Sequence, residues 1–199
     1  WGAAHALARN RAEPILVAPP RHGMAILRPL PVEALRLCRE TSEALRDLGR
    51  PVIDRGRVFA VSHSGRMVSI DLRTGERVWT RNLASTQTPW VAGDFIYVVT
   101  TEGEVVCLSR DDGRVRWVHQ LERWEDPERQ EGVIVWSGPV LASNRLIMVS
   151  SDGRITALSP YSGKVLGQIL RDHGSYISPI VANGRMLVLD TEGNLTAYQ

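Results

Sequence analysis

From residue 51 onward, short apolar runs alternate with polar turns that contain glycine. In residues 51–83 four apolar runs are separated by three such turns, whose glycines are Gly56, Gly65 and Gly75. Apolar runs of this length between glycine turns are typical of β-strands. Glycine supplies the positive φ that tight hairpin turns require. The stretch therefore predicts four short antiparallel strands joined by tight turns.

The same pattern recurs in residues 89–121, 139–170 and 179–199. A proline opens each of the four copies, and a glycine follows fourteen residues later: Pro51 and Gly65, Pro89 and Gly103, Pro139 and Gly153, Pro179 and Gly193. A repeat of about 40 residues made of short strands is the signature of a β-propeller blade. We therefore predict an all-β fold, a partial β-propeller of about four blades of four-stranded antiparallel sheets. The last blade stops after its third strand.

A second set of landmarks marks the outer strand of each blade. Ten residues beyond the first glycine stands another, at Gly75, Gly113 and Gly163; four residues further stand Trp79 and Trp117, with Gly167 in the third copy. We expect the glycine to form the turn into the outer strand and the tryptophan to pack against the neighbouring blade. An indole buries a large area and can donate a hydrogen bond. The alternative is that these tryptophans bind a ligand.

The copies begin 38, 50 and 40 residues apart. The long interval contains the charged segment 123–131, which we expect to be a loop from the outer strand of one blade to the inner strand of the next. Such extra segments lie outside the repeated scaffold. Because the repeats fill most of the chain, function is expected in loops and edges.

Residues 1–50 form the second part of the predicted organisation. Trp1 is expected to end a preceding blade, and residues 14–31, with five prolines, read as an irregular linker. Residues 32–48 carry leucines at helical spacing between Pro31 and Gly49, which suit the two ends of a helix. The sequence predicts an amphipathic helix there, packed on the propeller edge or bound to a partner. The blades then occupy residues 51–199.

Composition excludes several classes of function. The net charge is +2, so neither nucleic acid nor another strongly charged partner is implied. The chain contains no run of eighteen apolar residues, so no transmembrane helix is predicted. No signal peptide is visible. The two cysteines, Cys38 and Cys107, are expected to form neither a disulfide nor a metal site. Since fewer than four complete blades do not close a ring, we expect the C-terminal portion of a longer protein.

The search for catalytic chemistry yields no candidate. The five histidines are scattered, and none has a second ligand at metal-binding spacing. Asp111-Asp112-Gly113 resembles a piece of a calcium loop but lacks the alternating acidic positions and the distal glutamate. No serine stands in a nucleophile elbow. The prediction is a non-enzymatic protein without catalytic, cofactor-binding or metal-binding residues.

The run Ile70-Asp71-Leu72-Arg73-Thr74-Gly75, with Trp79 and the counterparts in later copies, resembles the repeat of the pyrroloquinoline-quinone-type β-propellers. In one branch, the quinoprotein dehydrogenases, the propeller holds the quinone and calcium in a central funnel. Those enzymes typically have adjacent cysteines and a set of acidic ligands, which this chain lacks. The other branch is the BamB-like family of outer-membrane protein assembly factors. Residues 51–65 resemble a late blade of that family, and the resemblance covers about residues 44–199.

The BamB-like resemblance implies a scaffold at the periplasmic face of the outer membrane. It implies binding to the periplasmic repeats of a BamA-like, barrel-inserting subunit through loops between blades. An N-terminal lipid anchor of the longer parent protein would hold it at the membrane. The family's acidic binding loop precedes the strand that Pro51 opens, where this chain has Asp47 between Arg46 and Arg50. The alternatives are a fragment of a quinoprotein dehydrogenase and a propeller sensor domain.

Overall fold

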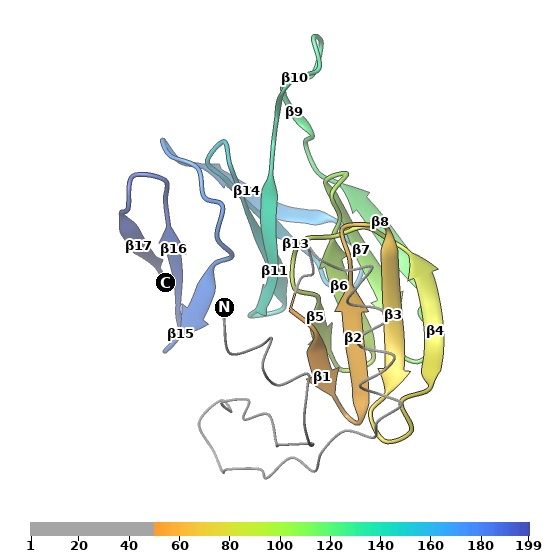
Figure 1. The fold of residues 1–199 in the computed structure, drawn as a ribbon. Coiled ribbons are helices and arrows are strands. Elements are labelled where there is room, and N and C mark those ends of the chain that lie inside the picture. The colour runs from red at the N-terminus through yellow and green to blue at the C-terminus, as the bar shows by residue number, and fades with distance from the viewer. Residues whose placement is uncertain (1–49) are drawn as a thin grey trace, which may run out of the picture.

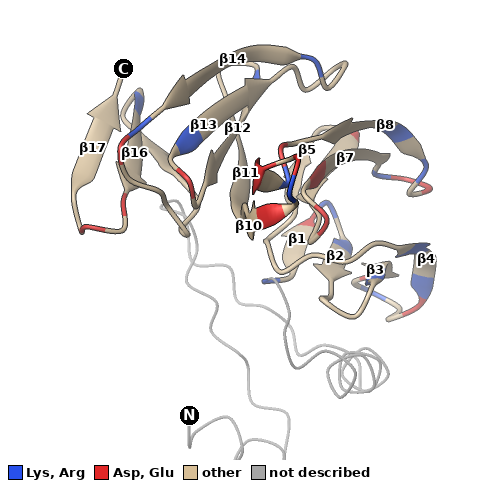
Figure 2. Ribbon diagram, turned by 90° about the horizontal axis from the view of Figure 1, so that it is seen from above, with Lys and Arg blue, Asp and Glu red and all other residues tan. Residues whose placement is uncertain are grey.

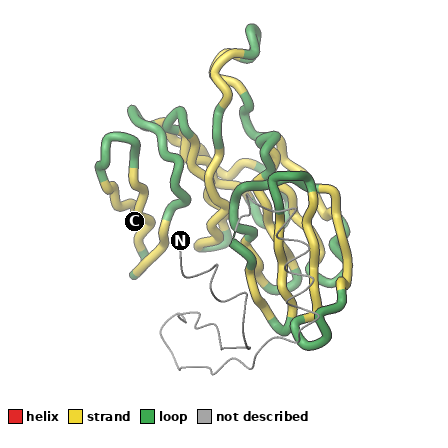
Figure 3. Tube along the Cα trace, viewed as in Figure 1, coloured by secondary structure: helices red, strands yellow, loops and turns green. Residues whose placement is uncertain are grey.

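The computed structural model describes residues 50–199, which form strands and turns and contain no helix (Figures 1 and 3). Most of the strands belong to four antiparallel sheets, each with its strands in chain order. The predicted all-β fold, a partial propeller with an incomplete last blade, is confirmed. No helix in this part of the chain has the length and apolar character needed to cross a membrane.

Each sheet is one blade. The first blade contains β1 (Val52–Asp54), β2 (Arg57–Val61), β3 (Arg66–Asp71) and β4 (Arg77–Asn82). The second contains β5 (Trp90–Ala92), β6 (Phe95–Val99), β7 (Glu104–Ser109) and β8 (Val115–Gln120). The third contains β11 (Trp136–Ala142), β12 (Arg145–Ser150), β13 (Arg154–Leu158) and β14 (Val165–Leu170). The fourth contains β15 (Ile180–Ala182), β16 (Arg185–Leu189) and β17 (Leu195–Tyr198).

The outer strands of the three complete blades pair in the same way. Each outer strand has one register shift near its start. The residue just after the shift pairs with a residue of the third strand: Trp79 with Ser69, Trp117 with Cys107, and Gly167 with Ala157. The turns before these strands contain Gly75, Gly113 and Gly163 at φ of 76°, 66° and 68°. This left-handed backbone is readily adopted by glycine. Trp79, Trp117 and Gly167 therefore occupy equivalent positions.

The blades form an arc, with the first strands of the blades inside and the fourth strands outside (Figure 2). β5 contacts both β1 and β11, and β11 also contacts β15, so neighbouring blades meet along their inner strands. We call the contacts between successive blades the first, second and third junctions. Most of the hydrophobic core lies in these junctions, and a smaller buried cluster, Ala60, Val68 and Ile70, belongs to the first blade alone.

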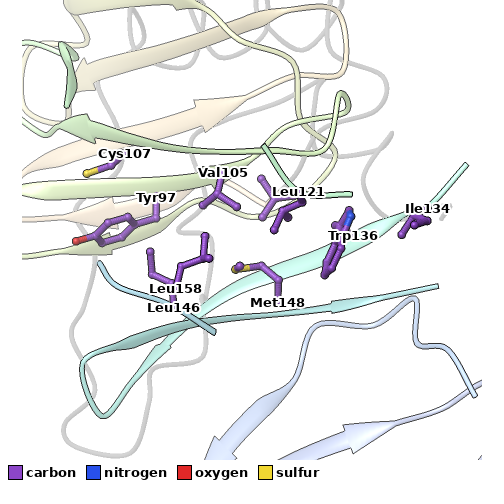
Figure 4. Packing of buried hydrophobic residues seen from close by; sticks show 10 residues of the cluster. Tyr97, Val105, Cys107, Leu121, Ile134, Trp136, Leu146, Met148 and Leu158 are labelled. Carbon is purple, nitrogen blue, oxygen red and sulfur yellow. The ribbon is translucent and has the colours of Figure 1, made fainter. Parts of the chain in front are cut away.

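The second junction holds a large part of this core. Tyr97, Val105 and Cys107 of the second blade face Leu146 and Met148 of the third, and all five are nearly inaccessible to solvent (Figure 4). These side chains alternate along their strands with residues that face the opposite junction, as the two-residue period of a strand requires. Each blade is therefore apolar on both faces, which explains the continuous apolar runs in the sequence.

The segment between the second and third blades differs from the predicted loop. It contains a two-stranded hairpin, β9 (Trp124–Asp126) and β10 (Glu131–Val133), which projects beyond the blades (Figure 1). The Asp126 carboxylate closes the turn by accepting the backbone N–H groups of Glu128 and Arg129 at 3.0 and 3.1 Å. Such local side-chain bonds are a common device of turns. The predicted blade end at Trp1, the linker 14–31 and the helix 32–48 lie outside the described residues.

Candidate functional site

The first junction is closed by Trp79. Its Nε1 donates a hydrogen bond to the carbonyl oxygen of Arg110 in the second blade, at 3.1 Å. Its ring lies on Gly113, where an added Cβ would be only 2.8 Å from the indole. The glycine thus provides both the positive φ of the turn and the flat surface on which the ring packs.

The second junction repeats this arrangement one blade further along. The Trp117 Nε1 donates to the carbonyl oxygen of Pro160 at 3.0 Å, and the ring covers Gly163, where an added Cβ would lie 2.6 Å from it. Tyr97 packs beside the indole at 6.0 Å between ring centroids. In both junctions the tryptophan of one blade packs on the glycine in the turn before the outer strand of the next blade.

The third junction lacks the tryptophan. A Cβ added to Gly167 would meet nothing within 4 Å, and Gly167 is not in the left-handed region of φ. A groove of about 590 Å³ lies there between the third and fourth blades. Its lining is mainly apolar and includes Ile155, Gly167, Ile169, Met186 and Tyr198, with the arginines Arg145 and Arg185.

Ion pairs also join neighbouring blades. Arg110 of the second blade is 8% exposed and donates from Nε to the Asp54 carboxylate of the first blade at 3.0 Å. Its guanidinium lies 5.9 Å from the centroid of Phe59. Arg171 and Asp190 make a similar contact at the third junction, 3.1 Å apart. The sequence gives no local signal for these pairs, since the first joins residues 56 positions apart.

Buried hydroxyl groups tie the segments between blades to the next sheet. The Ser85 Oγ donates to the carbonyl oxygen of Val99 at 2.5 Å, and the Ser175 Oγ donates to that of Leu189 at 2.6 Å. These serines occupy matching places after the first and third blades. They connect each segment to the sheet that follows it, so their role is structural.

Several ionisable groups have shifted pKa values, each with a structural cause. The pKa of Asp71 is lowered because its carboxylate accepts backbone N–H groups of Thr74 and Arg73 in the turn before β4. The pKa of Asp112 is lowered because the Arg114 N–H donates to it in the equivalent turn. Burial raises the pKa of the Cys107 thiol to about 12. These shifts report turns and core packing.

Within residues 50–199, no three side chains of histidine, cysteine, aspartate or glutamate gather where they could share a metal ion. Cys107 is buried as a free thiol in the second junction. Of the three predicted partner-binding residues, Arg50 is exposed just before β1, whereas Arg46 and Asp47 lie outside the described part.

The β9–β10 hairpin is an exposed, folded feature at a place where the sequence predicts only a loop. Its acidic side chains Glu125, Glu128 and Glu131 are exposed, and red marks the hairpin in Figure 2. Val133 is 59% exposed. At the hairpin's base the Arg123 guanidinium lies over the Trp124 ring, 5.4 Å from its centroid. The excess of acidic residues between Glu122 and Glu131 was the available sequence signal for an exposed, charged extension.

Two families of known proteins match parts of the chain. Residues 33–119 match the family described as outer membrane protein assembly factor BamB. Residues 80–169 match the family described as the β-propeller domain of glucose, ethanol and alcohol dehydrogenases. The two matches overlap in the second blade, because both families are built from the same kind of repeat.

Curated relatives carry the BamB name. The chain is 27% identical over 164 residues to outer membrane protein assembly factor BamB of Marinobacter adhaerens, a match that covers 81% of this chain and 40% of that protein. It is 29% identical over 150 residues to BamB of Salmonella typhimurium, covering 74% of this chain and 36% of that protein. The chain thus spans well under half the length of these relatives.

Solved structures agree on the fold. The BamB structure from Moraxella catarrhalis superposes with a TM-score of 0.65 at 22% identity, covering 76% of this chain and 44% of that one. A quinohemoprotein alcohol dehydrogenase from Pseudomonas putida superposes with a TM-score of 0.58 at 13% identity, covering 71% of this chain and 28% of that one. The second likeness reflects the shared fold alone. The repeat pattern, the blade architecture and the named relatives agree that the chain is a partial β-propeller similar to the BamB proteins.

Proposed function

We propose that this chain is a non-enzymatic interaction module of the machinery that assembles β-barrel proteins in the outer membrane. It would act at the periplasmic face of that membrane and bind the periplasmic repeats of a BamA-like, barrel-inserting subunit. The observation that carries the proposal is the match of residues 33–119 to the BamB family, joined by curated relatives of that name.

The construction of the blades supports a scaffold role. The tryptophans, the buried arginine and the buried serines all make contacts within or between blades. These polar and aromatic side chains therefore hold the arc of blades together. Partner contacts then fall to exposed loops that a rigid scaffold positions.

The segment before β1 is the proposed contact with the barrel-inserting subunit. It contains Arg46, Asp47 and Arg50, and Arg50 is exposed next to the first blade. Charged groups at the rim of an interface chiefly set the association rate and its dependence on salt. This contact should therefore weaken as the salt concentration rises.

The test is a titration of the 199-residue chain with the purified periplasmic repeats of the barrel-inserting subunit from the same organism. We expect saturable binding, and we expect Asp47→Arg to weaken it by about tenfold, which corresponds to about 1.4 kcal/mol. Arg114→Glu in the second blade serves as the matched control, because Arg114 is exposed and lies outside the proposed contact. Absence of binding at high micromolar concentration would refute the proposal.

A second candidate function follows from the match of residues 80–169 to the dehydrogenase propellers. It is a fragment of an enzyme that uses pyrroloquinoline quinone. Adding this quinone with calcium and following its absorption separates the two candidates. Stoichiometric binding of the chromophore would favour the enzyme, and an unchanged spectrum favours the interaction module.

A further inference from the structure

The β9–β10 hairpin lies outside the four blades. Its strands form a separate two-stranded sheet. The blades on either side of it, the second and the third, both have four strands, and the hairpin projects beyond them (Figure 1). Residues 124–133 contribute no side chain to the buried clusters of the described blades. A hairpin of two strands is only marginally stable by itself in water, so its order depends on its base or on a partner.

The base of the hairpin is firmly fixed to the blades. Ile134 and Trp136, which follow β10, are both 4% exposed and belong to the core of the second junction. The Trp136 Nε1 donates a hydrogen bond to the carbonyl oxygen of Glu122 at 2.8 Å. The Arg123 guanidinium pairs with the Glu102 carboxylate at 2.7 Å. The arm therefore starts from a rigid scaffold, which is the usual support of a binding loop.

One face of the hairpin carries an apolar pair. Trp124 and Val133 lie directly opposite each other in the register of β9 and β10, so their side chains share a face. Val133 is 59% exposed and Trp124 is half-buried, and Val135, just beyond the hairpin, is 44% exposed. Tryptophan is enriched among the side chains that dominate binding at protein interfaces. This pair is suited to the centre of a contact with another protein.

Acidic residues flank the pair in the sequence. Residues 122–133 contain five acidic residues and two arginines, a formal charge of −3 in a chain whose total is +2. Both arginines are already in ion pairs, Arg123 with Glu102 and Arg129 with Asp126. Three exposed carboxylates of the hairpin form no ion pair within residues 50–199: Glu125, Glu128 and Glu131. An apolar centre with an acidic rim is complementary to a partner surface with a basic rim.

The hairpin and the segment before β1 lie at the same end of the blades. Each leads into the first strand of a blade, β11 or β1, and all the blades share one strand order with antiparallel pairing. The first strands are neighbours, since β5 contacts both β1 and β11. A partner bound at the segment before β1 can therefore reach the hairpin across a single blade.

We propose that the β9–β10 hairpin is a second contact with the barrel-inserting subunit. Trp124 and Val133 dock on an apolar spot of the periplasmic repeats, and the acidic side chains of the hairpin face lysine or arginine around that spot. The inference rests on the proposed binding to that subunit and adds a contact of different chemistry to it. A second contact within one complex forms intramolecularly and so raises the affinity. Removing the hairpin should weaken the binding without abolishing it.

The charge of the hairpin is tested by Glu128→Lys combined with Glu131→Lys. Titrated with the purified periplasmic repeats of the barrel-inserting subunit, this variant should bind at least tenfold more weakly than the unmodified chain. Its affinity should also depend less on salt, because fewer complementary charges remain. The matched control is Glu76→Lys combined with Asp94→Lys. It makes the same change of charge at exposed turns at the opposite end of the blades, and should bind as the unmodified chain does.

The apolar pair is tested by Val133→Asp, which should also weaken the binding at least tenfold. Val118→Asp is its control, because Val118 is 50% exposed and lies on the outer strand β8. In a third variant a short glycine-serine linker replaces residues 124–133. Its urea midpoint should equal that of the unmodified chain, since these residues lie outside the buried clusters, and its affinity should fall at least tenfold.

The outcomes separate this contact from the proposed function. If the linker variant binds as tightly as the unmodified chain, the inference is overturned and the proposed function stands, because Asp47→Arg still tests the first contact. Equal losses in the hairpin charge variant and in its control would reveal a general effect of net charge and would also overturn the inference. No binding by the unmodified chain would refute both the proposed function and this contact.

Discussion

The tryptophan-on-glycine contact of the first junction can be tested by a double-mutant cycle. Trp79→Ala removes a side chain that is 7% exposed. At about 25 cal/mol per Å² and about 200 Å² for a buried tryptophan, the lost burial amounts to about 5 kcal/mol as an upper value. Large-to-small core substitutions of this kind typically cost about 3–5 kcal/mol. We expect a value in that range, part of it from the donor that the Arg110 carbonyl loses.

Gly113→Ala should also destabilise the chain, for two separable reasons. At a φ of 66° an alanine pays about 1–2 kcal/mol of backbone strain. Its Cβ would in addition lie 2.8 Å from the indole of Trp79, and such overpacking costs about 1–3 kcal/mol. In the Trp79→Ala background only the backbone part remains. The two substitutions should therefore be non-additive by about 1–3 kcal/mol.

Urea unfolding of the two single variants, the double variant and the unmodified chain measures this coupling. Gly93→Ala is the matched control, because Gly93 has a φ of 58° but an added Cβ there meets nothing within 4 Å. It should pay the backbone cost and nothing more. The reasoning is refuted by a coupling energy below about 0.5 kcal/mol, the ordinary limit of additivity, or by equal costs for Gly113→Ala and Gly93→Ala.

Three further predictions concern charged and reactive groups. The Cys107 thiol, whose pKa burial raises to about 12, should resist iodoacetamide at pH 8 in the folded chain and react in urea, as peptide mass spectrometry would show; rapid labelling of the folded chain would contradict its burial. The lowered pKa of Asp71 adds stability that is present above about pH 4 and is lost as the pH falls through the pKa of Asp71 in the folded chain. Asp71→Asn should therefore flatten the decline of the urea midpoint between about pH 5 and 2.5, and an unchanged slope would disprove this. Arg110→Met should destabilise the chain by about 1–2 kcal/mol, because it removes the hydrogen bond to the Asp54 carboxylate, whose side chain is 35% exposed and so partly screened by solvent; adding Asp54→Asn should recover part of that loss, and no recovery would argue against the pairing.

The sequence predicted the blades well because their signals are local. Glycines at fixed spacing specify the turns, because the turns need a positive φ that few other residues adopt. Gly65 and Gly103, for example, have φ of 93° and 77°. The apolar runs between them have strand length. Blade number, the incomplete last blade and the cross-blade place of the tryptophans follow from that periodicity alone.

What the sequence did not predict depends on contacts between distant residues. The ion pair of Arg110 with Asp54 forms only when two blades are set side by side. The β9–β10 hairpin is held by the Asp126 turn and by strands of three residues, too short for a hydrophobic period to appear. The groove near Gly167 is lined by residues of both the third and the fourth blade, which are distant in the sequence, so no local pattern marks it.

Most of the core lies between the blades, and this determines the order in which the molecule unfolds. Because each blade contacts only its neighbours, the free energy of unfolding is approximately a sum of one term for each blade and one for each junction, as in a one-dimensional chain of coupled units. We expect the third junction to have the smallest such term, since Gly167 contributes no side chain to it and only Val149, Ile155 and Val188 form its buried apolar cluster. Unfolding should then begin by release of β15–β17, with the first two junctions intact. A glycine at the position where the first two blades carry tryptophan thus makes the fourth blade the first part of the arc to unfold.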